Sequence, residues 1–200
     1  MSAATSDLAI ANMALSHLGA DSRIESMLEK STEARAMKQW YNVCRLVTLE
    51  RFDWSFARKR LALALHSEDP PEGAWNYRYQ YPADCVSFRR LRNPLGEQQD
   101  PVPFQEETAP DGTRSIVTNL EDAVGIYTYD CTSTLVFPAT FVTALSHNLA
   151  FRTGFQITKK QSIANAQGQL YDGLFRRASG QNANAAAAEP PRDAERIRGR

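Results

Sequence analysis

The sequence has few cysteines, and none of them is placed for a metal site or a disulfide framework. Cys44, Cys85 and Cys131 are odd in number, lie far apart and form no Cys-x-x-Cys pair. No apolar stretch reaches the roughly 18 residues that a membrane helix needs, and no basic segment precedes an apolar one at the N-terminus. We therefore expect no zinc site, no membrane span and no standard export signal, and synthesis in a reducing cytoplasm.

The chain also lacks an excess of charge of either sign. Its 23 Lys and Arg residues balance its 23 Asp and Glu residues, so the chain as a whole has little attraction for phosphates. Of its 200 residues 42% are hydrophobic, which is enough for one core without disulfides or metals. Most of the basic residues are arginine, a bias that suits planar contacts at interfaces or phosphates but also follows from high-GC codon usage.

Signatures of catalysis are missing as well. The sequence has no Gly-x-Ser-x-Gly, no phosphate-binding loop and no dinucleotide fingerprint. Each histidine stands alone, without a carboxylate at ligand spacing: His17, His66 and His147. Acidic pairs such as Glu25 with Glu29, or Glu106 with Glu107, suit a glycosidase but are also typical of a solvated surface. We expect no enzyme activity, no cofactor and no metal.

Apolar residues at helical spacing occur in two blocks, one at each end of the chain. The predicted helices cover residues 7–19, 31–51, 57–65, 138–154 and 158–177. The helix at 31–51 has two apolar faces, which favours a central position. Trp54 and Phe56 are expected to fill the core next to it.

The middle of the chain has the period of two that is typical of strands. An aromatic ladder of Trp75, Tyr77, Tyr79 and Tyr81 suits one face of a strand packed on the helices better than a stacking platform for single-stranded nucleic acid. Further strands are predicted at 84–91, 102–107, 115–118 and 124–129, forming one small antiparallel sheet.

These predictions combine into an α+β fold that is mainly α. An antiparallel helical bundle (residues 5–66 and 138–177) carries an inserted small antiparallel β region (about 75–131). Residues 1–177 form one domain. Residues 178–200 have few large apolar side chains, an alanine run and four late arginines, so they are predicted to be an extended C-terminal arm.

A second basic group lies inside the β region. Arg89, Arg90 and Arg92 alternate with Phe88 and Leu91. Such a group suits contact with phosphates, and it also suits an exposed strand that is protected against edge pairing.

The order of these pieces resembles the head-to-tail adaptors of short-tailed phages, the family called tail tubular protein A or packaged-DNA stabilisation protein. The resemblance covers about residues 5–177. It is carried by Asp7-Leu-x-Ile-x-Asn-x-Ala-Leu-x-x-Leu-Gly19, Tyr41 with Arg45, Trp54-Ser55-Phe56-Ala57 with Arg60, Trp75-x-Tyr77-x-Tyr79, Tyr81-Pro82-Ala83-Asp84-Cys85, and Phe137-Pro138-x-x-Phe141.

The resemblance implies a virion structural protein at the head–tail junction, present in the host cytoplasm during assembly. Adaptors of this family form a dodecameric ring between the portal protein and the tail nozzle, extend the DNA channel and help retain packaged DNA. We expect the free chain to be monomeric before assembly, because no long heptad seam remains for self-association. Contact with packaged DNA is expected to be weak and non-specific.

In similar adaptors the C-terminal segment runs along neighbouring portal subunits. That role falls here to 178–200, with the hypothetical portal contacts Arg176, Arg177, Arg192, Arg196, Arg198 and Arg200. The hypothetical nozzle or DNA-channel contacts are Arg89, Arg90 and Arg92. Two alternatives stay open: a peptidoglycan-degrading tail enzyme that uses Glu25 or Glu29 as the acid, and a nucleic-acid-binding module that uses the same three arginines.

Overall fold

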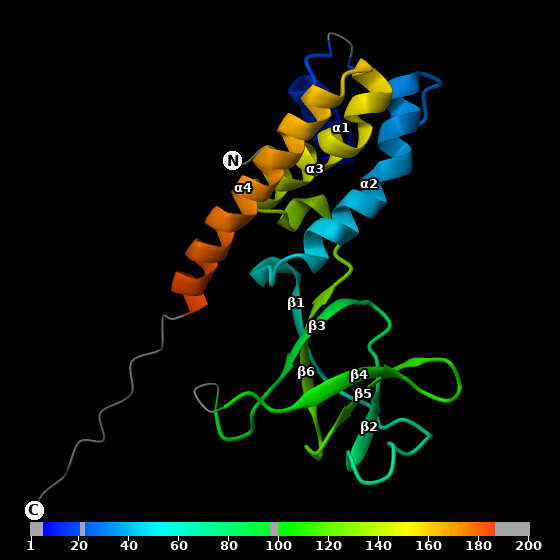
Figure 1. The fold of residues 1–200 in the computed structure, drawn as a ribbon, viewed down its shortest axis with the longest axis vertical. Helices are drawn as coiled ribbons and strands as arrows, with labels where there is room; N and C mark the ends of the chain where they lie inside the picture. The colour runs from blue at the N-terminus through cyan, green and yellow to red at the C-terminus, as the bar shows by residue number, and fades with distance from the viewer. Residues whose placement is uncertain (1–5, 21–22, 97–99, 187–200) are drawn as a thin grey trace, which may run out of the picture.

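The computed structural model describes residues 6–20, 23–96 and 100–186, with side chains up to residue 176. Helices and strands separate in space, so the molecule has a helical part and a β part, a mixed α+β fold (Figure 1). The helices are α1 (Asp7–His17), α2 (Thr32–Glu50), α3 (Ala139–Thr158) and α4 (Gln161–Ala186). The strands are β1 (Arg58–Ala62), β2 (Tyr77–Gln80), β3 (Cys85–Leu91), β4 (Phe104–Thr108), β5 (Arg114–Thr118) and β6 (Val124–Tyr129). Short 3-10 turns at Ser55–Ala57 and Thr134–Val136 lie at the two connections between the parts.

Serine caps start the first two helices. The side chain of Ser6 accepts a hydrogen bond from the amide of Ala9 (3.1 Å), and the side chain of Ser31 accepts one from the amide of Ala34 (3.1 Å). Each bond satisfies an amide that has no partner within its helix. The predicted start near Ser31 is confirmed.

The third helix continues beyond its predicted end at Gly154 and reaches Thr158, where Lys159 in the left-handed conformation ends it. Gly154 is needed for packing instead. A Cβ at this position would lie 3.0 Å from the Cβ of Ala164, so the glycine lets α3 and α4 approach closely. Glycine inside a helix is unfavourable locally, and here the contact between the two helices outweighs that cost.

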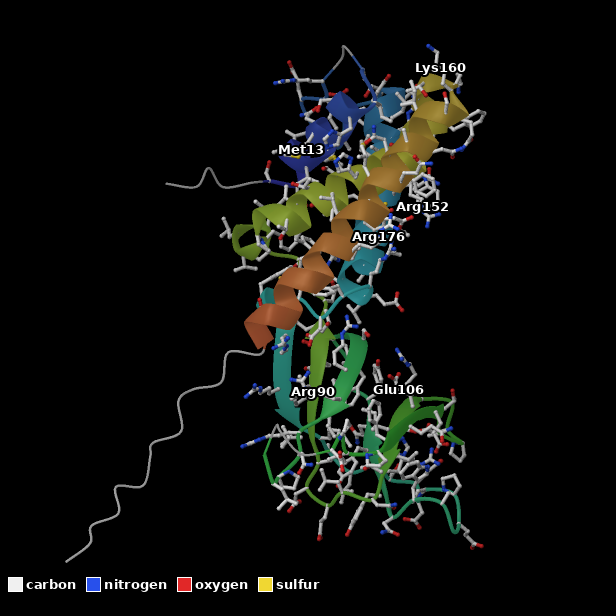
Figure 2. The ribbon with its side chains drawn as sticks, turned by 60° about the vertical axis from the view of Figure 1, so that its left-hand side comes forward. Met13, Arg90, Glu106, Arg152, Lys160 and Arg176 are labelled. Carbon is white, nitrogen blue, oxygen red and sulfur yellow. The ribbon has the colours of Figure 1, made fainter. Side chains whose placement is uncertain are left out.

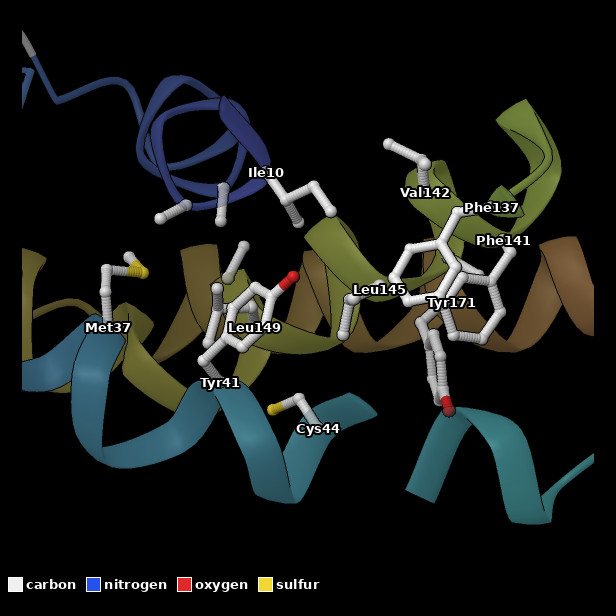
Figure 3. Close-up of a cluster of buried hydrophobic side chains, with 14 of the residues drawn as sticks. Ile10, Met37, Tyr41, Cys44, Phe137, Phe141, Val142, Leu145, Leu149 and Tyr171 are labelled. Atoms are coloured by element: carbon white, nitrogen blue, oxygen red, sulfur yellow. The ribbon is translucent and has the colours of Figure 1, made fainter. Parts of the chain in front are cut away.

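The central helix is α3, not the predicted 31–51. Contacts connect α3 with α1, α2 and α4, while α1 and α2 touch only slightly. Figure 3 shows Leu145 and Leu149 of α3 between the side chains of α1 and α2. Trp54 is 5% exposed and stacks edge-on against Phe141 at 5.2 Å, which confirms the prediction that it fills this core.

The segment that was predicted to be a helix at 57–65 contains strand β1, and this prediction is wrong. Arginine, leucine and alanine favour a helix locally, but β1 pairs antiparallel with β6, more than sixty residues later in the chain. The β region therefore begins at residue 58 rather than near 75. Tertiary pairing overrides local propensity here.

The β part holds two three-stranded antiparallel sheets instead of one. Their strand orders are β1-β6-β3 and β2-β5-β4. A second apolar core lies in this part, made of Leu63, Tyr79, Phe88, Leu91, Ile116, Ala123 and Tyr127. Four of the predicted strands agree with β3, β4, β5 and β6 to within about two residues.

The tyrosines of the aromatic ladder, Tyr77, Tyr79 and Tyr81, pack into this second core. The prediction that the ladder packs on the helices is therefore wrong. Tyr79 is 1% exposed, and its hydroxyl donates to the Leu120 carbonyl oxygen (2.9 Å). Its neighbour Arg78 is buried as well, in an ion pair with Glu107 (2.9 Å). With its central ring buried, the ladder offers no continuous stacking surface.

The fourth helix runs to Ala186, beyond its predicted end near Arg177. The first nine residues of the predicted extended arm are therefore helical, which corrects that prediction. Alanine-rich sequence readily extends a helix that is already formed, because each added residue gains a backbone hydrogen bond without a new nucleation cost.

Candidate functional site

The two parts of the molecule are joined by a buried arginine. Arg45 of α2 is 5% exposed and pairs with the carboxylate of Asp130, just after β6. It also donates to the Cys131 carbonyl oxygen (2.8 Å). A buried guanidinium that binds a carboxylate and a carbonyl fixes the β part relative to α2.

Arg89 makes a second connection at the same junction. It is the extra residue of a β-bulge, because Phe88 pairs with Tyr127 while Arg90 pairs with the adjacent Ile126. The bulge lets its side chain reach the end of α2. There Nη2 donates to three backbone carbonyl oxygens, those of Leu49 (3.0 Å), Glu50 (2.8 Å) and Phe52 (2.8 Å), and Nε donates to Thr128 Oγ1 (2.9 Å).

Arg89 thus satisfies the carbonyls that a helix leaves unpaired at its C-terminus, where a positive charge is also favourable. Burial lowers the pKa of its guanidinium, and the nearby Asp53 carboxylate opposes that shift. Its donors are used within the chain. The structure therefore places this predicted nozzle or DNA contact at an internal junction.

The neighbouring arginines lie on one face of the first sheet. Arg58 of β1 is opposite Thr128, and Arg60 is opposite Ile126. Arg90 of β3 is opposite Ile126 from the other side. The amide of Arg92 donates to the Val124 carbonyl oxygen (2.8 Å), which continues this register by one pair. Residues directly opposite each other share a face of the sheet.

We call the set Arg58, Arg60, Arg90 and Arg92 the arginine face (Figure 2, where Arg90 is labelled). Ile126 and Thr128 on this face are fully buried, consistent with arginine stems lying over them. Two of the four members were missed by sequence analysis, because a helix was predicted at 57–65. The alternation of Arg58 and Arg60 around Lys59 was the available signal.

One carboxylate holds two members of the arginine face in place. Asp53 accepts two hydrogen bonds from Arg58, at 2.9 and 2.8 Å, and lies 3.6 Å from Arg90. The side chain of Arg90 remains 43% exposed. Lys59, on the opposite face, pairs with Asp84 and lies over the ring of Tyr129.

The predicted portal contacts fall at the edge of the described residues. Arg176 is exposed on α4 (Figure 2), and of Arg177 only the helical backbone is described. The remaining candidates Arg192, Arg196, Arg198 and Arg200 lie outside the described residues.

A groove of about 430 Å³ lined by residues of α2, α3 and α4 was not predicted from the sequence. Arg51 at its rim pairs with Asp172 (2.7 Å) and lies over the rings of Tyr171 and Phe175. Arg152 lies 5.4 Å from the centre of the Phe151 ring. The charged side chains that line the groove are Arg51, Arg152 and Asp172. Each of them contacts another side chain of the helical part.

Three of the four carboxylates considered for catalysis have partners within the chain: those of Glu29, Glu106 and Glu107. The Glu29 carboxylate accepts hydrogen bonds from Ser31 Oγ (2.5 Å) and from the Glu25 amide (2.9 Å), and the Ser31 bond is the main cause that lowers its pKa. Glu106 pairs with Arg114 at 2.7 Å. A general acid needs a raised pKa, so the shift of Glu29 has the wrong direction for that role.

His17 and His147 stack with ring centres 4.0 Å apart. His17 bonds to Ser146, and His147 bonds to Gln167. Burial and the nearby His147 lower the pKa of His17. Within residues 6–20, 23–96 and 100–186, no three His, Cys, Asp or Glu side chains come close enough to hold a metal, and no helix has the length and apolar character to cross a bilayer.

Comparison with models of known protein families finds no match, and comparison with curated proteins finds none.

Proposed function

We propose that this chain is a virion structural protein, a head-to-tail adaptor that forms a ring between a portal protein and a tail nozzle. The support is the order of sequence motifs together with one structural observation. That observation is a terminal helix whose backbone continues well past the last of its described side chains.

Among the described side chains of α4, which end at Arg176, Phe175 is the last in the helical core, at 5% exposure. The helix continues to Ala186, which adds about 16 Å at 1.5 Å per residue. Figure 1 shows this end of α4 leading away from the other helices. A projecting helix followed by an arginine-containing segment suits an arm that binds a neighbouring subunit, because such an arm covers a large surface for its length.

In the proposed architecture the helical part is an antiparallel bundle, the β part is its insertion, and α4 leads into the C-terminal arm. The arginines of the arm and of the end of α4 form forked hydrogen bonds with portal carboxylates. The free chain is monomeric and assembles into a dodecameric ring on the portal. The ring extends the DNA channel, helps retain packaged DNA and presents a platform for the nozzle.

The proposed role requires no catalysis. The rival role of a peptidoglycan-degrading enzyme requires Glu25 or Glu29 to deliver a proton, and the lowered pKa of Glu29 weighs against Glu29 as that acid. A zymogram on peptidoglycan separates the two roles, because a cleared zone with wild-type protein that is lost in Glu29→Gln would favour the enzyme.

The test is a pull-down with the portal protein encoded by the same genome. One variant lacks residues 187–200 and keeps all of α4, a second lacks 178–200, and a third carries glutamine at the four distal arginines. We expect all three to keep the fold, as judged by circular dichroism, and to bind the portal less than wild type. Unchanged portal binding by the 178–200 deletion would refute the proposed arm.

The assembly state provides an independent test. Light scattering of the isolated protein is expected to give the mass of one chain. Particles of ring size without the portal would contradict assembly on a portal template.

A further inference from the structure

We propose that a seam in the helical part binds a helix of a partner protein, one that carries an acidic side chain among apolar ones. The seam is the groove between α2 and α4, and one face of α3 lies beneath it. We call the side chains of that face the α3 stripe: Asn148, Phe151, Arg152 and Phe155 (Figure 2, where Arg152 is labelled). The inference goes beyond the proposed function, which assigns portal binding to the C-terminal arm and gives this seam no role.

The packing of the helices leaves the seam open. Helices α2 and α4 both pack on α3 but hardly on each other. The residues of the α3 stripe recur every three or four positions, so they share one face of α3. Beside them the groove is lined by Val47 of α2 and by Gly168 of α4. The seam thus has the position that a further helix occupies in a bundle, in the groove between two neighbours.

The length of the seam suits a short helix. From Asn148 to Phe155 the α3 stripe extends for about 10 Å, at a rise of 1.5 Å per residue. On α2 the side chains from Trp40 to Val47 extend equally far. A partner helix of about three turns covers both rows.

Apolar side chains along the seam are exposed to water. Phe155 is 56% exposed and Val43 of α2 is 45% exposed. Val43 shares a face of α2 with Trp40 and Val47, because the three recur at helical spacing. Removing neighbouring apolar side chains from water favours association, so these residues supply a driving force for an apolar partner face.

A buried amide in the floor of the groove lacks a donor. Asn148 is 2% exposed, and its Nδ2 donates to the Cys44 carbonyl oxygen (3.3 Å) and to Thr48 Oγ1 (3.2 Å). Its Oδ1 accepts no hydrogen bond from any residue that the structure describes, although the side chain lines the groove. A buried acceptor without a partner costs free energy, which a donor on a bound ligand removes.

One turn further along α3, Arg152 lacks an acidic partner. Its guanidinium lies 5.4 Å from the centre of the Phe151 ring and 5.9 Å from that of Trp40. Within residues 6–20, 23–96 and 100–176 no carboxylate pairs with it and no acceptor takes its hydrogens. The other arginine of the groove, Arg51, is paired with Asp172 (2.7 Å). Arg152 therefore supplies the groove's one positive charge without a counter-charge among these residues.

These polar groups define the chemistry of the partner. A guanidinium forms its strongest bonds with a carboxylate, which an aspartate or glutamate of the partner provides. The single charge of Arg152 matches one carboxylate, whereas a nucleic acid brings a row of charges that the Asp172 carboxylate repels. The donor that Asn148 Oδ1 needs lies one turn away on the partner helix, on an amide or hydroxyl side chain.

The experiment selects peptides from a yeast-displayed library, in which an alanine-based helix of about five turns has one face randomised. Selection is run in parallel on the full chain and on its Arg152→Gln variant. We expect the wild type to enrich leucine-like side chains with one aspartate or glutamate between them. The variant should enrich the apolar side chains without the acid.

The selected peptide is then synthesised with a fluorophore, and its affinity is measured by anisotropy. Arg152→Gln should weaken binding at least about tenfold, the factor for one hydrogen bond to a charged group. Replacing the acid of the peptide with its amide should weaken binding to the wild type equally and to Arg152→Gln no further. Phe155→Ser should also weaken binding. The control Arg35→Gln removes an exposed arginine on another face of α2 and should leave the affinity unchanged.

Three results would overturn the proposal. The first is a library that yields no peptide with preference for the wild type over a variant with both Arg152→Gln and Phe155→Ser. The second is equal affinity for the acidic peptide and its amide, because the seam would then select apolar surface alone. The third is a dimer of the wild type that Phe155→Ser abolishes, because a second copy of this chain would then cover the seam. All measurements use the isolated chain, so failure of portal docking leaves these results unaffected.

Discussion

Replacing Arg89 with methionine tests whether this side chain fixes the β part to the end of α2. Methionine keeps much of the length and apolar volume of arginine but removes every donor. The carbonyl oxygens of Leu49, Glu50 and Phe52 and the hydroxyl of Thr128 then lose their partner. Arg90→Met is the matched control, since it changes the next residue of the same strand, which has one long ion pair and a side chain that is 43% exposed.

The expected loss follows from three N–H groups, one on Nε and two on Nη2, because the three carbonyl oxygens share the two hydrogens of Nη2. At about 1.5 kcal/mol for each hydrogen bond from a charged donor, the gross loss is about 4.5 kcal/mol. Side-chain freedom regained in the variant and hydration of the partly exposed carbonyls return about 1–2 kcal/mol. We therefore expect Arg89→Met to lower the free energy of unfolding by about 3 kcal/mol, and Arg90→Met by about 0.5 kcal/mol, the typical value for a surface ion pair.

The assay is urea unfolding followed by circular dichroism and by tryptophan fluorescence, to which Trp54 at the junction contributes. In Arg89→Met the midpoint should fall with either probe, and the two transitions should separate if the parts unfold independently once the junction is weakened. Equal midpoints for the two methionine variants would refute the role assigned to Arg89.

Two further predictions concern packing and pH. A Cβ at Gly125 would lie 2.7 Å from the Phe88 ring, so Gly125→Ala should destabilise the protein by about 1–3 kcal/mol in thermal unfolding. In α4 a Cβ at Gly173 meets nothing within 4 Å, so Gly173→Ala should stabilise the protein by about 0.5–1 kcal/mol. The reverse order of stabilities would contradict the packing described. Burial, reinforced by His147, lowers the pKa of His17 below 6.5, so the unfolded chain binds more protons and stability should decrease as pH falls through about 6.5. His17→Gln should lose this decrease, and a wild-type pH profile identical to that of the variant would exclude His17 as its source.

Local signals in the sequence predicted the helical part well. A serine at the start of the 31–51 helix and apolar residues at helical spacing are properties of a few neighbouring residues, and α2 begins at the expected place. Strand β1 was missed because its residues favour a helix and its pairing partner β6 lies more than sixty residues away. The end of α3 was misplaced because Gly154, a typical helix stop, serves close packing against Ala164.

The candidate site was predicted only in part for a related reason. Arg89, Arg90 and Arg92 stand together in the sequence, but a bulge lets Arg89 reach the end of α2, where its donors bind backbone carbonyl oxygens, while Arg90 stays partly exposed on the sheet. Whether neighbouring residues of a strand share a face depends on such bulges, which composition does not indicate. Arg58 and Arg60 join the face only through the pairing of β1 with β6.

The most direct test of the proposed function is cryo-electron microscopy of this protein mixed with the portal encoded by the same genome, compared with each component alone. The proposal predicts a ring seated on the portal, with the extension of α4 running along portal subunits. A protein that stays a free monomer beside an unoccupied portal would contradict the adaptor role.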